Sequence, residues 1–206
     1  RLDGPMGTNP RHWKEKWRRY GPMGLAAKAA LKASEGTLGL SLEAQYTAPL
    51  DSVIAALDGV EVDDEVKVRA LKGCKPRLTL LGRMKHLQPS LAASTLAEFD
   101  RVAIAEVDGD LVGYWCFTIR DGSLYERGVT VSEELRGRGL ARRLLLAAVL
   151  SMDTSPESGR LMATSDLFNR ASRRMLERCG LQVDGVMTQG RIPLMGHFHV
   201  IWKPMG

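Results

Sequence analysis

The sequence predicts an α+β protein, in which a mixed, mostly antiparallel sheet is flanked by helices and follows a helical N-terminal extension. Three observations support this prediction. Residues 101–131 form three β-rich runs broken by tight-turn dipeptides, residues 138–151 form a leucine-rich helix, and residues 160–203 continue as strand, helix and two strands. Strands joined by such short links pair as an antiparallel meander. The chain has 206 residues, 44% of them hydrophobic, which is enough to bury a core around this sheet.

The first 76 residues are predicted to form the helical extension. Four segments have helical character, and each is followed within two residues by a glycine, a common residue after a helix end. Asn9-Pro10 adds an N-cap and a proline at the first helical position. The predicted helices are residues 10–20, 25–34, 49–58 and 63–72, and residues 37–48 are predicted to be irregular.

Residues 77–206 are predicted to form the main domain. It begins with a short strand at residues 77–81 and a helix at residues 90–99. The turns of the meander are Asp108-Gly109 and Asp121-Gly122, dipeptides that favour tight hairpins. After the leucine-rich helix we expect a strand at 160–165, a helix at 166–178, and strands at 182–188 and 197–203.

The composition argues against several classes of protein. No apolar run approaches the roughly 20 residues of a membrane span, and the N-terminus lacks the apolar centre of a signal peptide. Cys74, Cys116 and Cys179 are odd in number and widely spaced, which argues against a disulfide framework or a zinc site. We therefore expect a cytoplasmic protein with no membrane association.

The stretch Arg136-Gly137-Arg138-Gly139-Leu140-Ala141 separates the third meander strand from the leucine-rich helix. Small residues let a ligand approach the backbone closely. The first turn of a helix offers unpaired N–H groups and the positive end of the helix dipole. Arg136 and Arg138 add positive charge and forked donors for phosphate oxygens. The stretch therefore predicts a pyrophosphate site.

Two other glycine-rich phosphate sites do not fit this stretch. A Walker loop requires Gly-x4-Gly-Lys-Ser/Thr, which the sequence lacks. The Rossmann fingerprint would require glycine or alanine in place of Arg142, and a parallel βαβ unit where this chain has a meander.

The strand, the turn and the leucine-rich helix resemble the acetyl-CoA-binding motif of the GNAT superfamily of N-acetyltransferases. Residues 167–187 are similar to the family's Asn-x-x-Ala-x-x-x-Tyr-x-x-x-Gly-Phe segment, with Asn169 and Gly180-Leu181 at the family's spacing. The resemblance extends over roughly residues 77–204 and leaves residues 1–76 outside it.

The resemblance implies a sheet splayed between the last meander strand and residues 160–165, with acetyl-CoA in the opening. The acetyl group would pass to a primary amine by direct attack on the thioester. Backbone groups of Val129, Thr130 and Val131 would pair with pantetheine, and the amides of residues 137–141 would hold the pyrophosphate. Asn169 and Ser172 would line the pantetheine arm, and Arg173 would lie near the outer phosphates.

Direct attack requires a base that takes the proton of the amine, and the family commonly places it on the last meander strand. Glu126 is the nearest carboxylate and Tyr125 is a second candidate, while the alternative is that Glu126 faces solvent. The family's general-acid tyrosine corresponds to Leu176, which cannot donate a proton. Water or another group would then protonate the thiolate, or catalysis has been lost. Cys179 continues the apolar stripe of its helix and is predicted to be core.

Basic charge is concentrated at the N-terminus. Residues 1–35 carry eight Lys/Arg and three Asp/Glu, a balance that equals the net charge of +5 of the whole chain. Trp13, Trp17 and Tyr20 form one helical stripe among these charges. Such a stripe suits docking on nucleic acid or an acidic partner, or packing against the domain or another subunit.

Three functions are compatible with the sequence. The first is an N-acetyltransferase that uses acetyl-CoA and an unidentified amine, either as a monomer or as a homo-oligomer. The second is a structural or assembly protein that keeps the fold, and the third is a nucleic-acid-binding module that uses residues 10–20. No metal site is predicted, because His197 and His199 share one strand face without a third ligand.

Overall fold

The structure is a computed structural model. It describes residues 20–22, 26, 41–61, 63–72, 78–88, 99–153, 159–192 and 196–202. The chain divides into two compact units. The larger unit consists of residues 46–163 and 175–182, and the smaller unit of residues 1–45, 164–174 and 183–206.

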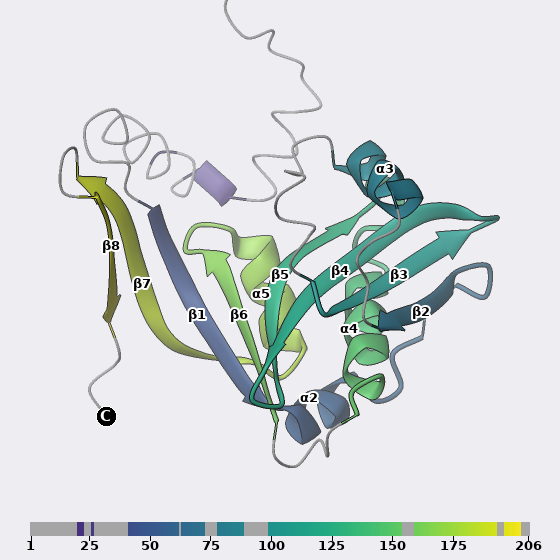
Figure 1. The fold of residues 1–206 in the computed structure, drawn as a ribbon, viewed down its shortest axis with the longest axis horizontal. Coiled ribbons are helices and arrows are strands. Elements are labelled where there is room, and N and C mark those ends of the chain that lie inside the picture. The colour runs from purple at the N-terminus through teal and green to yellow at the C-terminus, as the bar shows by residue number, and fades with distance from the viewer. Residues whose placement is uncertain are drawn as a thin grey trace, which may run out of the picture. The chain divides into compact units, whose positions relative to one another are not determined.

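A mixed, mostly antiparallel sheet forms the larger unit, with the strand order β2-β3-β4-β5-β6 (Figure 1). The first four strands pair antiparallel with their neighbours, and β6 joins β5 in parallel. The meander predicted at residues 101–131 is therefore confirmed. The strands are β2 (Lys67–Lys72), β3 (Arg101–Val107), β4 (Asp110–Arg120), β5 (Ser123–Val131) and β6 (Arg160–Asp166).

Both hairpins of the meander turn at the predicted dipeptides. Asp108 and Asp121 each have φ 50°, and Gly109 and Gly122 have φ 88° and 73°. Positive φ at both central residues is the geometry whose twist matches that of paired strands, and the Asp-Gly sequence favours it.

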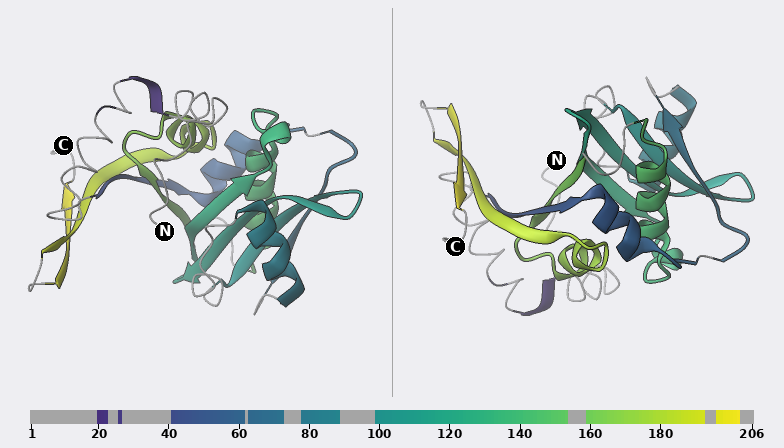
Figure 2. Two further views of the ribbon diagram at one scale, coloured as in Figure 1. Left: turned by 90° about the horizontal axis from the view of Figure 1, so that it is seen from above. Right: turned by 90° about the horizontal axis from the view of Figure 1, so that it is seen from below.

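Different helices cover the two faces of the meander (Figure 2). On one face, α3 (Leu78–Leu87) buries Leu80 and Met84 against side chains of β3 and β4. On the other, α4 (Leu140–Leu150) packs on the sheet and contacts α2 (Leu50–Leu57). The buried residues of α4 recur at helical spacing, so that one stripe faces the sheet; they are Leu140, Leu144, Leu145, Ala148 and Val149.

A glycine sets how closely α4 approaches β4. A Cβ at Gly113 would lie 3.3 Å from Leu144 Cδ1 and 3.6 Å from Leu140 Cδ2. The absent side chain therefore lets the first turns of α4 lie directly on the strand.

The β5 strand contains a bulge, and its pairing with β6 ends beside that bulge. Glu126 pairs with Phe117 and Gly128 with Cys116, so Arg127 is an extra residue in β5. Over the described lengths of both strands, β5 and β6 pair only at Leu124 with Leu161 and at Tyr125 with Met162. The rest of β5 pairs with β4 alone, which is the splay expected between these two strands.

The smaller unit contains the β-hairpin of β7 (Gln182–Ile192) and β8 (Gly196–Trp202), with pairing from Ile192–Gly196 to Val186–Trp202. It also contains the first residues of β1 (Ser41–Pro49) and of α5 (Arg170–Arg178). The two C-terminal strands and the helix before them are as predicted, although the helix begins at Arg170 rather than at residue 166.

Three predictions in the N-terminal half are wrong. Residues 63–72 were predicted to be a helix, but they contain the strand β2, because residues 67–72 pair with residues 101–106 of β3. Residues 77–81 were predicted to be a strand, but residues 78–81 begin α3, which is helical because its apolar residues pack at helical spacing. Residues 41–48, predicted to be irregular, lie in β1, where Ala44, Tyr46 and Ala48 are buried at alternate positions. The helices predicted at 10–20, 25–34 and 90–99 fall largely or wholly outside the described residues.

Gly159 joins the start of α2 to the start of β6, and we expect it to be intolerant of any side chain. Its carbonyl accepts the N–H of Leu50 at 3.0 Å, and a Cβ there would lie 2.6 Å from both the Gly122 carbonyl oxygen and Leu50 Cδ1. We predict that Gly159→Ala lowers the free energy of unfolding by about 3 kcal/mol in urea titrations. Gly82→Ala is the control, because a Cβ there meets nothing within 4 Å in the middle of α3, and it should be neutral or stabilising by up to about 1 kcal/mol. Equal effects of the two variants would contradict this account.

Candidate functional site

The turn before α4 has the backbone that an anion site needs. The 3₁₀ helix η2 (Glu133–Leu135) leads into it, and Gly137 and Gly139 have φ 83° and 84°, conformations that side chains disfavour. Gly139 is the N-cap residue and has no side chain with which to cap the helix. The first N–H groups of α4 therefore lack the usual capping acceptor and can bind an anionic ligand.

The two arginines of the turn already have protein contacts. The Nε of Arg136 donates to the carbonyl oxygen of Val131 at 3.0 Å, which ties the turn to the end of β5. The Nη1 of Arg138 lies 3.2 Å from Oδ2 of Asp63, in an ion pair in which both side chains are largely exposed. Arg136 therefore stabilises the turn through a backbone carbonyl group. Arg138 forms an exposed ion pair with the carboxylate of Asp63.

The carbonyl oxygen of Val131, one of the groups predicted to pair with pantetheine, accepts the Arg136 hydrogen bond. On the β4 side, Val129, Thr130 and Val131 pair with Trp115, Tyr114 and Gly113. The Thr130 hydroxyl donates to Oε1 of Gln88, which also accepts from the Tyr114 hydroxyl at 2.8 Å. The side chain of Thr130 is therefore anchored to the end of α3, and the edge of β5 is held in place from its α3 face.

Glu126 and Tyr125 lie where β5 parts from β6. Glu126 is half-buried rather than facing solvent freely, and it is the last residue before the bulge. Burial, and secondarily the Glu126 charge, raise the pKa of the Cys116 thiol. The ring of Tyr125 lies 5.9 Å from the guanidinium carbon of Arg120.

Asn169, Ser172 and Arg173 belong to the smaller unit, and each takes part in local structure there. Oδ1 of the buried Asn169 accepts the N–H of Ser172 at 3.2 Å, so Asn169 caps the N-terminus of α5. Arg173 Nη1 donates to the carbonyl oxygen of Leu167 at 3.1 Å. The larger unit thus contains the predicted residues from Tyr125 to Ala141, and the smaller unit contains these three.

Leu176 and Cys179 are core residues. Leu176 is 2% exposed and Cys179 is completely buried, and burial raises the pKa of Cys179 to about 12 even though Arg142 lowers it. A neutral, inaccessible thiol is neither a nucleophile nor an efficient acid at neutral pH. The predicted core role of Cys179 is confirmed.

The two buried thiols should be unreactive in the folded protein. In a Cys74→Ser variant, we expect Cys116 and Cys179 to react with a disulfide reagent such as DTNB roughly a hundredfold more slowly than in denaturant, because both thiols are buried with raised pKa values. The absorbance of the released thionitrobenzoate gives the rates. Fast reaction of one thiol in a native sample would show that its side chain reaches solvent.

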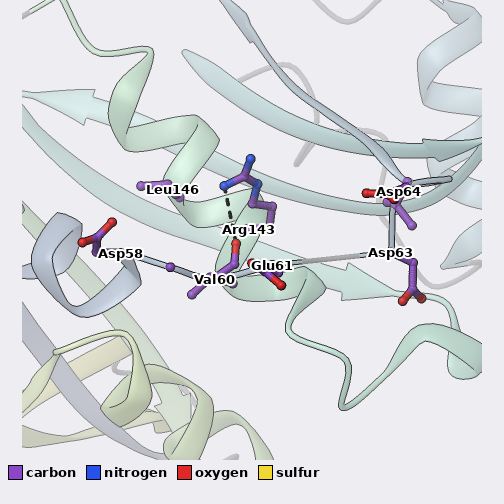
Figure 3. Close-up of a pocket in the computed structure, with 9 residues that line it drawn as sticks. Asp58, Val60, Glu61, Asp63, Asp64, Arg143 and Leu146 are labelled. Atoms are coloured by element: carbon purple, nitrogen blue, oxygen red, sulfur yellow. Dashed lines mark hydrogen bonds between the residues drawn. The ribbon is translucent and has the colours of Figure 1, made fainter.

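The loop between α2 and β2 also lies beside this turn, although it was not predicted to be part of the site. A Cβ at Gly139 would lie 3.5 Å from the Glu61 carbonyl oxygen, and Arg143 Nη1 donates to the Val60 carbonyl oxygen at 3.5 Å (Figure 3). A cavity of about 600 Å³ lies between residues 58–61, 63, 64 and 66 of this loop and Arg143 and Leu146 of α4. The five carboxylates in residues 58–65 are the sequence feature that could have drawn attention to this loop.

No group of three or more His, Cys, Asp or Glu side chains within the described residues is placed to hold a metal ion. Among the helices that the structure describes, none has both the length and the apolar character that a bilayer span requires. The arm at residues 10–20 lies outside the described residues, except for Tyr20, which is buried.

The family model "Acetyltransferase (GNAT) family" matches residues 74–181, which is more than half of the chain. No curated protein matches the chain. The matched range contains the meander, the turn, α4 and α5. The match thus includes the elements that build the larger unit's candidate site.

Several solved structures share this fold. A GNAT-family protein from Novosphingobium aromaticivorans is 22% identical, with a TM-score of 0.53 over 81% of this chain and 66% of that one. A functionally unknown conserved protein from Staphylococcus epidermidis is 13% identical, with a TM-score of 0.56 over 84% and 66%. A tandem GNAT protein from the clavulanic acid biosynthesis pathway is 17% identical, with a TM-score of 0.57 over 87% and 59%.

This chain spans three fifths to two thirds of the length of those structures. At these identities the likeness concerns the fold, and the family model carries the assignment. The chain belongs to the GNAT acetyltransferase family of acyltransferase enzymes.

Proposed function

We propose that the protein transfers the acetyl group of acetyl-CoA to a primary amine by direct attack in a ternary complex. One observation carries this proposal: the uncapped N-terminus of α4, preceded by two glycines at positive φ, follows directly from the part of β5 that β6 leaves unpaired. An extended pantetheine arm suits a strand edge, and a pyrophosphate suits a helix N-terminus.

In this proposal the amides of residues 137–141 hold the pyrophosphate, and Arg138 contributes its guanidinium once a phosphate replaces Asp63. Backbone groups of Val129, Thr130 and Val131 pair with pantetheine. The family resemblance gives Asn169, Ser172 and Arg173 a role in donor binding as well, which stays a prediction; within their own unit Asn169 caps α5 and Arg173 binds the Leu167 carbonyl oxygen. No metal takes part in this scheme.

The proposed reaction is an aminolysis of the thioester. Glu126 accepts a proton from the ammonium form of the acceptor, and the amine nitrogen then bonds to the carbonyl carbon. The carbon–sulfur bond breaks, and the sulfur leaves with the electron pair as thiolate. The new amide nitrogen releases its second proton to water, and the thiolate takes up a proton through water, because Leu176 cannot donate one. Tyr125 is the second candidate for the proton-transfer role. A base of this kind contributes roughly a hundred- to ten-thousandfold in rate.

The direct test is calorimetric titration with acetyl-CoA, followed by measurement of thiol release with a panel of primary amines. Micromolar binding together with amine-dependent thiol release would support the proposal. Absence of binding would overturn it and favour the second candidate, a structural or assembly protein that keeps this fold. The exposed Arg138–Asp63 ion pair and the buried Leu176 favour that alternative.

We further propose that residues 77–206 form the catalytic domain and that residues 1–76 form an N-terminal extension of it. The basic arm at residues 10–20 would dock on an acidic partner, on nucleic acid or on a second copy of the chain, and the protein would work in the cytoplasm.

A further inference from the structure

Residues 58–61 and 63–66, here called the acidic loop, lie against the turn proposed to bind phosphate. Asp63 pairs with Arg138 at 3.2 Å, and the Val60 carbonyl oxygen accepts a hydrogen bond from Arg143 at 3.5 Å. A Cβ on Gly139 would lie 3.5 Å from the Glu61 carbonyl oxygen. The acidic loop therefore occupies the immediate surroundings of the first turn of α4.

The charge around this turn is unusual for a polyanion site. Four guanidinium groups lie in the turn and the start of α4, at Arg136, Arg138, Arg142 and Arg143. Seven carboxylates lie in the acidic loop and in η2, at Asp58, Glu61, Asp63, Asp64, Glu65, Glu133 and Glu134. The carboxylates outnumber the guanidinium groups, so an incoming phosphate is attracted by the helix N-terminus and repelled by the acidic loop.

The contact between Asp63 and Arg138 can be exchanged at low cost. The two side chains are 57% and 60% exposed, and exposed ion pairs contribute little because water screens them. A guanidinium binds phosphate through short, charge-assisted hydrogen bonds, which are stronger than this contact. The carboxylate of Asp63 is turned away from Arg143, so Arg138 is the guanidinium that it opposes (Figure 3).

We propose that Asp63 competes with the phosphates of the acetyl donor for Arg138, and that the acidic loop thereby lowers the affinity for the donor. This inference rests on the proposed function of the same turn. When the donor binds, Arg138 exchanges Asp63 for a phosphate oxygen, and the released carboxylate remains close enough to repel the phosphates. Asp63 is in this sense a positioning residue that acts through Arg138.

A consequence concerns the product. Acetyl-CoA and CoA carry the same phosphates, so the acidic loop weakens both complexes by the same factor. The loop would therefore speed the release of CoA and raise the KM for acetyl-CoA, while the competition between donor and product stays unchanged.

The test is to measure the affinities of the full chain and of Asp63→Asn for acetyl-CoA and for CoA by calorimetry. We expect the substitution to tighten both complexes by the same factor, about three- to tenfold at low ionic strength. In 0.5 M salt the gain should shrink, because screening weakens a charge effect but not a packing effect. Asp121→Asn is the matched control, since it removes an exposed carboxylate from the turn before β5, at the end of that strand opposite Arg136, and it should change neither affinity.

A double-mutant cycle separates competition from general repulsion. Arg138→Gln should weaken acetyl-CoA binding, and in that background Asp63→Asn should gain about twofold or less. An equal gain in both backgrounds, or no gain in the parent, would overturn the inference while the proposed function stands. If the parent protein itself does not bind acetyl-CoA, the proposed function fails, and this inference fails with it.

Discussion

Gly139→Glu is expected to abolish acetyl-CoA binding and to leave the fold intact. Two effects act together in this variant. A side chain at φ 84° strains the N-cap residue, and a carboxylate at the start of α4 repels phosphate where the free N–H groups would bind it. We expect the affinity measured by calorimetry to fall by about a hundredfold or more, equivalent to about 2.7 kcal/mol.

Two control variants identify the cause of this loss. Gly109→Glu introduces the same side chain at φ 88° in a hairpin turn with open space around it, and it should bind acetyl-CoA like the parent. Gly139→Ala has the strain without the charge and should lose much less affinity than Gly139→Glu. Unchanged binding by Gly139→Glu would mean that the turn before α4 does not hold the phosphates.

Glu126→Gln is expected to lower kcat by roughly a hundred- to ten-thousandfold, with little change in the KM for acetyl-CoA. The amide keeps the size of the carboxylate but cannot accept a proton. The acid limb of the pH profile of kcat/KM should disappear as well, because that limb reports the protonation of the base. Steady-state thiol release over a range of pH gives both results.

Two comparisons make this result specific. Glu177→Gln removes an exposed carboxylate from α5 and should leave kcat unchanged. Tyr125→Phe removes only a hydroxyl, and a larger loss in this variant than in Glu126→Gln would transfer the catalytic role to Tyr125. If Glu126→Gln and Tyr125→Phe both keep the kcat of the parent protein, neither residue is the base of the reaction.

Locally encoded parts of the fold could be predicted from the sequence. The two Asp-Gly turns determine their own backbone, because glycine and aspartate accept the positive φ that a tight hairpin needs. The apolar spacing of α4 and the small residues before it are also local signals. The meander, the turn and the helix therefore followed from the residues themselves, whereas the assignment of this turn to acetyl-CoA came from the family resemblance and stays a prediction.

Elements that depend on partners distant in sequence could not be predicted in this way. β2 alternates only weakly between charged and apolar residues, and it is a strand because β3 pairs with it along its length. The glycine that follows β2 resembles a helix end, and Gly82 interrupts the helical character of α3. Pairing and packing outweighed local preference in both places.

The candidate site also contains features that depend on partners distant in sequence. The face of Glu126 could not be read from alternation, because Glu126 and Gly128 pair with consecutive residues of β4 although they are two apart in β5. The approach of residues 58–66 to α4 joins segments about 80 residues apart, and no local pattern announces such a contact. The sequence shows the clustered carboxylates of this loop, but it does not show that the loop lies beside α4.

The extra residue Arg127 has a consequence for where the molecule can open. A ladder without it would be straighter, since a bulge bends its strand and often terminates pairing. We expect that deletion of Arg127 would allow the parallel pairing of β5 with β6, which now ends at Tyr125 and Met162, to continue toward Val131. Main-chain hydrogen bonds would then close the gap between β5 and β6, and no space for an extended ligand would remain between them.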